Sequence, residues 1–469
     1  MASPEAVTPT RRTPRRNPAN APGYRHARTP VANKIDTPST RLDQQLTKGL
    51  RLGGTATGGC GRVEHGRVDN ARGREVPGGR ESAGQANYLE LFFDLVLVFA
   101  LNGVVTRIVP SLTSEDVATR WPSLFATVVL ALPLLWLWTT TGHITSRFDP
   151  RQRKIQLMVL ASAFGMMIMS TSLPYAFFGR GMAFVLPYVL LQVGRPLLLI
   201  RALPAGGPVR AIYTRSAIWF AGSAVLWIGG ALVKDERRLA LWAAAITVDL
   251  IGARLGWPVR GMPRLLVSAW AVERGRHLPE RYQQLLLIAL GETVLAVGIA
   301  YTNAPVTTET TVGLVTAYVT TVLLWRVYFH RSGEMLGAAV DAVANRSMFG
   351  RVAGAAHIVM VLGIVATAIG YEIVQQHALD RPYPVWIVLI LGGPALFLYG
   401  RIRLERVVFD RLSRRRVVAI VTLALAMFPL AFTNTLVASI AAAAVLIGVA
   451  VADSRHSAVR PPETPSPPA

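Results

Sequence analysis

Cysteine is almost absent from this sequence, and charged residues are scarce. Cys60 is the only cysteine among 469 residues, which excludes an internal disulfide framework and a cysteine-based metal site. Asp, Glu, Lys and Arg make up 16% of the chain, whereas a soluble domain carries about a quarter. The N-terminus lacks the charged, apolar and small-residue order of a cleavable signal peptide. We therefore expect a membrane protein whose own spans direct its insertion.

Familiar catalytic motifs are missing as well. The sequence holds no phosphate-binding Gly loop, nucleophile elbow, metalloprotease His pair or thiol motif. We therefore expect no enzymatic activity, no cofactor and no metal. The net charge of +22 indicates the Arg excess of cytoplasmic loops and not a nucleic-acid surface, so the expected partner is the lipid bilayer.

Long apolar runs are what the sequence has in abundance. Hydrophobic residues make up 52% of the chain, and windows of about 20 apolar residues, the length that crosses a bilayer as a helix, recur along it. We predict an all-α polytopic membrane protein with about twelve transmembrane helices. The windows lie at residues 88–105, 121–141, 156–176, 182–202, 216–233, 239–256, 283–302, 311–330, 352–374, 384–400, 416–432 and 434–452.

The spans divide the chain into consecutive parts. Residues 1–86 are rich in Pro, Gly, Thr and Arg and nearly lack aromatics, which predicts a disordered, basic cytoplasmic tail; the alternative is that part of it is never translated. We expect a six-helix membrane half at 87–256, a basic cytoplasmic linker at 257–282, a second six-helix half at 283–452 and a disordered tail at 453–469.

Arg and Lys gather in alternate connections between the spans. Because cytoplasmic loops carry the Lys and Arg excess, we predict that both termini are cytoplasmic and that the protein lies in the plasma membrane. The basic connections hold Arg147, Arg151, Arg153 and Lys154, then Arg201, Arg210 and Arg215, then Arg260, Arg264, Arg274, Arg276 and Arg281, then Arg331, Arg346 and Arg351, then Arg401, Arg403, Arg406, Arg411 and Arg414–Arg416.

The two halves share short patterns. Leu134–Trp136 is followed by His143, and Leu323–Trp325 is followed by His330, with a basic loop after each. Two six-helix halves of the same orientation would be parallel repeats, related by an axis along the membrane normal. We therefore expect such a repeat.

Several polar residues interrupt the apolar spans, where a carboxylate costs about 2.5–3.5 kcal/mol. Glu90 and Asp94 are four residues apart, so they share one face of the first span, and Asn102 lies two turns further along. Glu292 lies about nine residues into its span, which is about 14 Å deep. Arg195 precedes a proline and is our predicted partner for Asp94 or Glu292. These five residues are the predicted ion, proton or substrate path.

These and other polar residues also have structural explanations. Glu90 fits a first-turn acid at the membrane surface, Glu292 fits a hydrogen bond between helices, and Arg195 fits a side chain that reaches the cytoplasmic surface. His357 and Glu372 lie toward the inner and outer ends of one span. Both fit structural roles better than functional ones.

Four residues, which are Asp249, His277, Glu280 and His357, form a second group of candidates. Asp249 has Arg254 five residues on, which predicts an ion pair or an interfacial residue. His277 and Glu280 have a spacing that occurs in metal sites, but two ligands alone do not indicate a metal. A charged lead-in to the following helix explains them better.

Five segments of the chain resemble one protein family: Leu89–Ala100, Arg147–Pro150, Gln192–Arg195, His277–Arg281 and Ile288–Glu292. In order and spacing they are similar to the signatures of the bacterial low temperature requirement protein A family, over residues 86–450. The resemblance implies a bacterial multi-pass membrane protein, in a family named for a growth phenotype in the cold, and no defined biochemical activity. Thr139–Thr141 and His143 depart from the family, which often has more aromatics there.

Acids inside otherwise apolar spans favour an ion- or proton-coupled transporter or channel for a small ion or solute. In this interpretation Asp94 and Glu292 bind the ion or proton, Arg195 is the counter-ion, and Asn102 lines the path. The alternative is a membrane stress or structural protein without transport, whose buried charges only fix helix packing.

Overall fold

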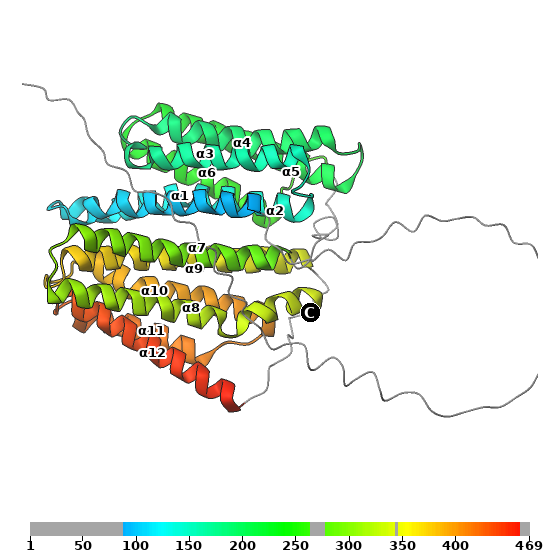
Figure 1. Ribbon diagram of the computed structural model, residues 1–469. Helices are drawn as coiled ribbons and strands as arrows, with labels where there is room; N and C mark the ends of the chain where they lie inside the picture. Colours follow the sequence, from blue (N-terminus) through cyan, green and yellow to red (C-terminus); the bar gives the residue numbers. More distant parts are fainter. Residues whose placement is uncertain (1–87, 263–276, 343–345, 460–469) are drawn as a thin grey trace, which may run out of the picture. The chain divides into compact units, whose positions relative to one another are not determined.

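The computed structural model describes residues 88–262, 277–342 and 346–459 (Figure 1). Within these residues there is no β-strand, and twelve α-helices follow one another along the chain. The predicted tail at 1–86 lies outside the described residues. The helices are α1 (Tyr88–Thr113), α2 (Arg120–Arg147), α3 (Arg153–Ser172), α4 (Gly181–Ala202), α5 (Pro208–Leu232), α6 (Asp235–Leu255), α7 (His277–Asn303), α8 (Thr308–Ala342), α9 (Arg346–Gln376), α10 (Pro384–Phe409), α11 (Arg414–Leu430) and α12 (Thr435–Val459).

Ten of the helices in the described part of the chain are long and apolar enough to cross a membrane. The predicted all-α polytopic membrane fold is therefore confirmed. Helices α6 and α11 are not among the ten, so the count of twelve spans stays a prediction. Two boundaries were predicted wrongly: α7 begins at His277, inside the predicted linker at 257–282, and α12 runs on to Val459, inside the predicted tail at 453–469.

Helix ends follow the expected backbone chemistry. Helices α5 and α10 begin at Pro208 and Pro384, where a fixed φ suits the first turn and the missing N–H leaves no bond unmade. Helix α6 ends at Gly256, whose φ of 75° is left-handed and therefore suits a residue without a Cβ.

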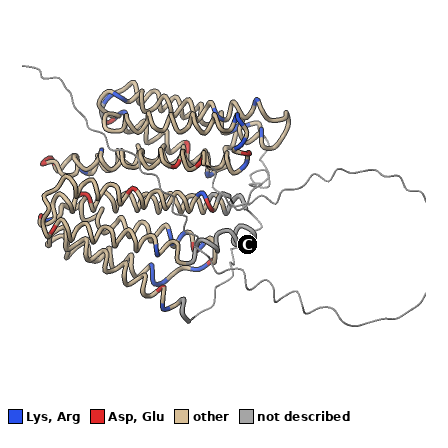
Figure 2. The backbone as a smooth tube through the Cα atoms, viewed as in Figure 1, with Lys and Arg blue, Asp and Glu red and all other residues tan. Residues whose placement is uncertain are grey.

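Consecutive helices run in opposite directions. Trp386, at the start of α10, donates from Nε1 to the carbonyl of Leu112 at the end of α1, at 2.8 Å. At the other end of the helices, Arg416 at the start of α11 lies 2.8 Å from Asp453 near the end of α12. The start of α1 and the end of α12 thus lie at the same end of the helices, and Figure 2 shows most Lys and Arg toward that end.

Helices α9 and α10 pack backbone against backbone through glycines. A Cβ on Gly363 would lie 2.5 Å from the backbone nitrogen of Phe397, and one on Gly393 would lie 2.7 Å from that of Thr367. Small residues at a helix interface permit this approach in membranes. Because α9 also contacts α7 and α1, this helix pair forms a closely packed wall beside the junction of the two halves.

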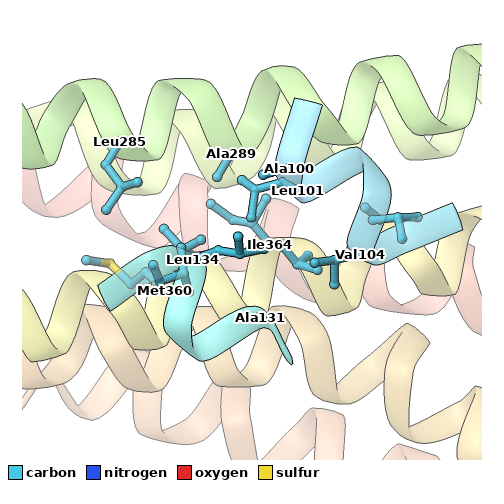
Figure 3. Close-up of a cluster of buried hydrophobic side chains, with 14 of the residues drawn as sticks. Ala100, Leu101, Val104, Ala131, Leu134, Leu285, Ala289, Met360 and Ile364 are labelled. Carbon is cyan, nitrogen blue, oxygen red and sulfur yellow. The ribbon is translucent and has the colours of Figure 1, made fainter. Parts of the chain in front are cut away.

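The two predicted halves meet through α1 and α2 on one side and α7 and α9 on the other. Buried apolar side chains from all four helices fill this junction, as Figure 3 shows. Polar contacts between α1 and α7 therefore lie in an apolar environment. The labelled residues are Ala100, Leu101, Val104, Ala131, Leu134, Leu285, Ala289, Met360 and Ile364.

Candidate functional site

Helices α1 and α7 lie side by side and run in the same direction. Asp94 bonds Arg281 near their starts, and Asn102 bonds Glu292 further along both. Eight residues separate Asp94 from Asn102, which is about 12 Å along a helix. The contact between α1 and α7 therefore carries two polar groups at different depths.

The first group, here named the arginine cluster, contains Glu90, Asp94, Trp138, Arg281 and Gln284. Arg281 holds Asp94 with two parallel hydrogen bonds of 2.7 Å each, from Nη1 to Oδ2 and from Nη2 to Oδ1. Trp138 of α2 donates from Nε1 to Asp94 Oδ1 at 2.8 Å. A bidentate arginine–carboxylate pair is among the strongest polar contacts in proteins.

The rest of the arginine cluster surrounds the guanidinium. Gln284 accepts from Arg281 Nη1 at 2.8 Å, and Glu90 Oε1 lies 3.9 Å from Arg281 Nε. The Trp138 ring centroid lies 5.2 Å from the guanidinium carbon. Glu90, Asp94 and Arg281 are all at most 2% exposed, so the predicted acids are buried together around one cation. Glu90 is an acid in the first turn of α1, as its structural explanation expects, and its side chain is buried within the protein.

The predicted pairing of Arg195 with Asp94 or Glu292 is wrong. Arg195 donates at 2.8 Å to Thr140 and Thr141 of α2, and it also bonds Gln192. Arg281 takes the position expected for Arg195. The sequence predicts a linker up to residue 282 and so gives Arg281 no place in a helix, whereas α7 includes this residue.

The second group, here named the glutamate pair, consists of Glu292 and Glu372. Glu292 is fully buried, and Asn102 donates from Nδ2 to its Oε1 at 3.0 Å. Glu372 of α9 is half-buried and interacts electrostatically with Glu292. Within the described residues, Oε2 of each is buried without a hydrogen-bond partner, and neither carboxylate forms an ion pair with Lys, Arg or His.

His357 borders the arginine cluster through aromatic contacts. Its Nδ1 bonds the carbonyl of Ala353 at 2.6 Å, so its Nε2 accepts from the Tyr328 hydroxyl at 2.8 Å. The His357 ring stacks on Tyr282 at 4.8 Å, and Tyr282 lies 6.0 Å from Trp138. This fully buried histidine links α7, α8 and α9 beside the cluster.

The remaining predicted residues lie elsewhere. Asp249 is fully buried on α6 and bonds Tyr188 and Trp227, so the predicted ion pair with Arg254 is wrong. Glu280 is half-buried in the first turn of α7, and the His277 side chain lies outside the described residues. No group of three His, Cys, Asp or Glu side chains able to hold a metal occurs in the described ranges.

Comparisons with known proteins match most of the chain. A family model described as bacterial low temperature requirement A protein (LtrA) matches residues 85–451. An uncharacterized protein of Rhizobium meliloti (strain 1021) is 32% identical over 334 residues, which cover 69% of this chain and 78% of the relative. No solved structure matches.

Proposed function

Because the chain belongs to the bacterial low temperature requirement A family and is a multi-pass membrane protein, we propose that it is an ion- or proton-coupled transporter or channel. It has no enzymatic activity, and its substrate is a small ion or solute. The glutamate pair is the observation that carries this proposal. Charged side chains inside a membrane are costly and mark ion or proton pathways.

The chemistry of the glutamate pair favours a bound proton or cation. Two neighbouring carboxylates repel each other when both are ionised, and burial away from water adds to the cost. Neither Glu292 nor Glu372 has a basic partner among the described residues to offset that charge. A proton or a small cation on the pair relieves the repulsion. Asn102 orients Glu292 by donating to Oε1, which leaves Oε2 as the acceptor.

The arginine cluster has a different role in this proposal. Arg281 already neutralises Asp94 through two short hydrogen bonds, so Asp94 needs no transported ion. We therefore propose that Asp94, Glu90 and Arg281 fix the contact between α1 and α7. The ion or proton sites are Glu292 and Glu372.

The helix contacts support the proposed six-helix repeat. Each pair of contacting helices in α1–α6 has a counterpart in α7–α12. Transporters built from repeats bind their ions where the repeats meet, which is where the glutamate pair lies. The corresponding pairs are α1–α2 with α7–α8, α1–α3 with α7–α9, α2–α3 with α8–α9, α2–α4 with α8–α10, α2–α6 with α8–α12, α3–α4 with α9–α10, α4–α5 with α10–α11 and α5–α6 with α11–α12.

We also propose a plasma-membrane location with both termini in the cytoplasm. The excess of Lys and Arg at the end of the helices where α1 begins and α12 ends supports this orientation. The partner in this location is the lipid bilayer, and no nucleic acid is involved.

A flux assay tests the proposal. The full-length protein is reconstituted in proteoliposomes and assayed with a panel of cations, protons and small solutes. We expect at least one flux that Glu292→Gln and Glu372→Gln abolish and that Glu115→Gln leaves unchanged, because Glu115 is exposed between α1 and α2. The same flux in wild type and both variants would overturn the assignment.

The non-transporting alternative rests on a specific observation too. The bidentate contact of Arg281 with Asp94 is what a protein needs if buried charges only fix helix packing. In that case no member of the panel moves faster than through empty liposomes, and the substitutions alter stability alone.

A further inference from the structure

A third buried carboxylate lies outside the α1–α7 contact. Asp249 of α6 is fully buried, and its Oδ2 accepts from the Tyr188 hydroxyl at 2.8 Å and from Trp227 Nε1 at 3.2 Å. Ser223 of α5 also faces the carboxyl group. Oδ1 is buried and has no hydrogen-bond partner in the part of the chain that the structure describes.

The hydrogen bonds that lead to Asp249 all point in one direction. Arg195 can only donate, so the Gln192 amide oxygen accepts from it. The Gln192 Nε2 therefore donates to the Tyr188 oxygen at 3.2 Å. The Tyr188 hydrogen is then left for Asp249 Oδ2. These three side chains, here named the donor chain, are each at most 3% exposed.

Helix α2 fixes the far end of the donor chain. Thr140 and Thr141 donate their own hydrogens to the carbonyls of Trp136 and Leu137, so each can accept from Arg195 at 2.8 Å. Among the residues that the structure describes, no acidic side chain pairs with the Arg195 guanidinium. Hydrogen bonds in series polarise one another, so the donor chain carries the influence of Arg195 to Asp249.

We propose that Asp249 is a second proton-binding site, with Oδ1 as the atom that takes the proton. Oδ1 gains one proton from the aqueous phase and becomes an O–H group, while Oδ2 stays an acceptor and keeps its bonds to Tyr188 and Trp227. No other bond forms or breaks. This inference does not rest on the proposed transport function.

A proton suits the surroundings of Asp249 better than a metal cation does. Hard cations require several oxygen ligands. Tyr188 and Trp227 instead present hydrogens to the carboxylate, and the indole nitrogen has no lone pair to offer. Helix α2 packs on α6 and contributes no charged group to Asp249 within the described residues. Arg195 acts electrostatically on Tyr188, and the donor chain connects it to Asp249.

Infrared difference spectroscopy on the full-length protein in lipid nanodiscs tests the site. Spectra are recorded from about pH 4 to about pH 9, the range in which buried carboxyl groups titrate. We expect a carboxylic C=O band that Asp249→Asn lacks and that the Glu292→Gln/Glu372→Gln double variant keeps. If Asp249→Asn keeps every wild-type band, the inference is overturned, whatever the glutamate variants do.

Two conservative variants test the donor chain without removing the carboxyl group. In Tyr188→Phe the titration midpoint of this band should rise by about one pH unit or more, because the anion loses a hydrogen bond. Gln192→Met should also raise the titration midpoint, but by a smaller amount, because the Tyr188 hydroxyl still donates to Asp249. Thr247→Val, an exposed position on α6, should leave it unchanged. An unchanged titration midpoint in Tyr188→Phe would overturn the inference that the donor chain acts on Asp249.

Discussion

The arginine cluster and the glutamate pair both place acids in the protein interior, but their surroundings differ in charge. In the arginine cluster each Asp94 oxygen receives a 2.7 Å bond from Arg281, and Trp138 adds another donor. In the glutamate pair, by contrast, a neutral amide donates to Glu292, and the charged group that acts on Glu292 is another acid, Glu372. Burial alone therefore does not identify an ion site in a membrane protein. In this account, a buried acid that has a compensating cation fixes the contact between helices, and a buried acid that lacks one binds the ion or proton.

The largest expected effect comes from removing the cation. Arg281→Met should lower the free energy of unfolding by about 3–5 kcal/mol, because it leaves buried carboxylates without their partner. Unfolding in mixed micelles, followed by loss of helicity, measures the change. The matched control is Arg260→Met at an exposed position. If Arg281→Met and Arg260→Met are equally stable, Arg281 does not stabilise the fold. The arginine cluster would then not differ from the glutamate pair in its structural role.

A smaller loss is expected when one neutral donor is removed from the arginine cluster. Trp138→Phe keeps an aromatic ring beside Arg281 but removes the N–H that bonds Asp94. The expected cost is about 1.5–3 kcal/mol, the value of a hydrogen bond to a charged group. The same unfolding assay applies, with Trp121→Phe, which is 50% exposed, as the control. A loss no larger than that of Trp121→Phe would mean that the bond contributes nothing.

The smallest effect on stability is expected in the glutamate pair. Glu292→Gln should change the free energy of unfolding by less than about 1 kcal/mol, with either no effect or a gain, because it removes an uncompensated buried charge. The new amide oxygen still accepts from Asn102. Thermal unfolding at neutral pH checks the sign. A loss comparable to that of Arg281→Met would show that Glu292 is a structural group like Asp94.

The sequence predicts the membrane fold well because apolar length is a local property. Each window of about 20 apolar residues can be found without knowing its neighbours. Glu90, Asp94, Asn102 and Glu292 stood out for the same reason, as polar residues in apolar surroundings. Their contacts across α1 and α7, by contrast, depend on how the helices pack.

Pairing across helices could not be predicted in the same way. The position of Arg195 inside a span predicts a buried counter-ion, yet which helix Arg195 faces depends on packing that no local pattern encodes. One signal was present: Arg281 and Glu292 are eleven residues apart, three turns on the same face of one helix. Glu372 was set aside because it lies near a helix end, and its approach to Glu292 depends on how α9 aligns with α7.

The most direct test compares the ratio of ion flux to folded protein in Glu292→Gln and Trp138→Phe. It asks whether the glutamate pair binds the ion while the arginine cluster only stabilises the helix contact. Both variants are reconstituted at equal amounts of folded protein, and flux of the ion that wild type moves is recorded. The expected result is loss of flux in Glu292→Gln, despite wild-type stability, and retained flux in Trp138→Phe, despite lower stability. Wild-type flux in Glu292→Gln together with lost flux in Trp138→Phe would contradict it.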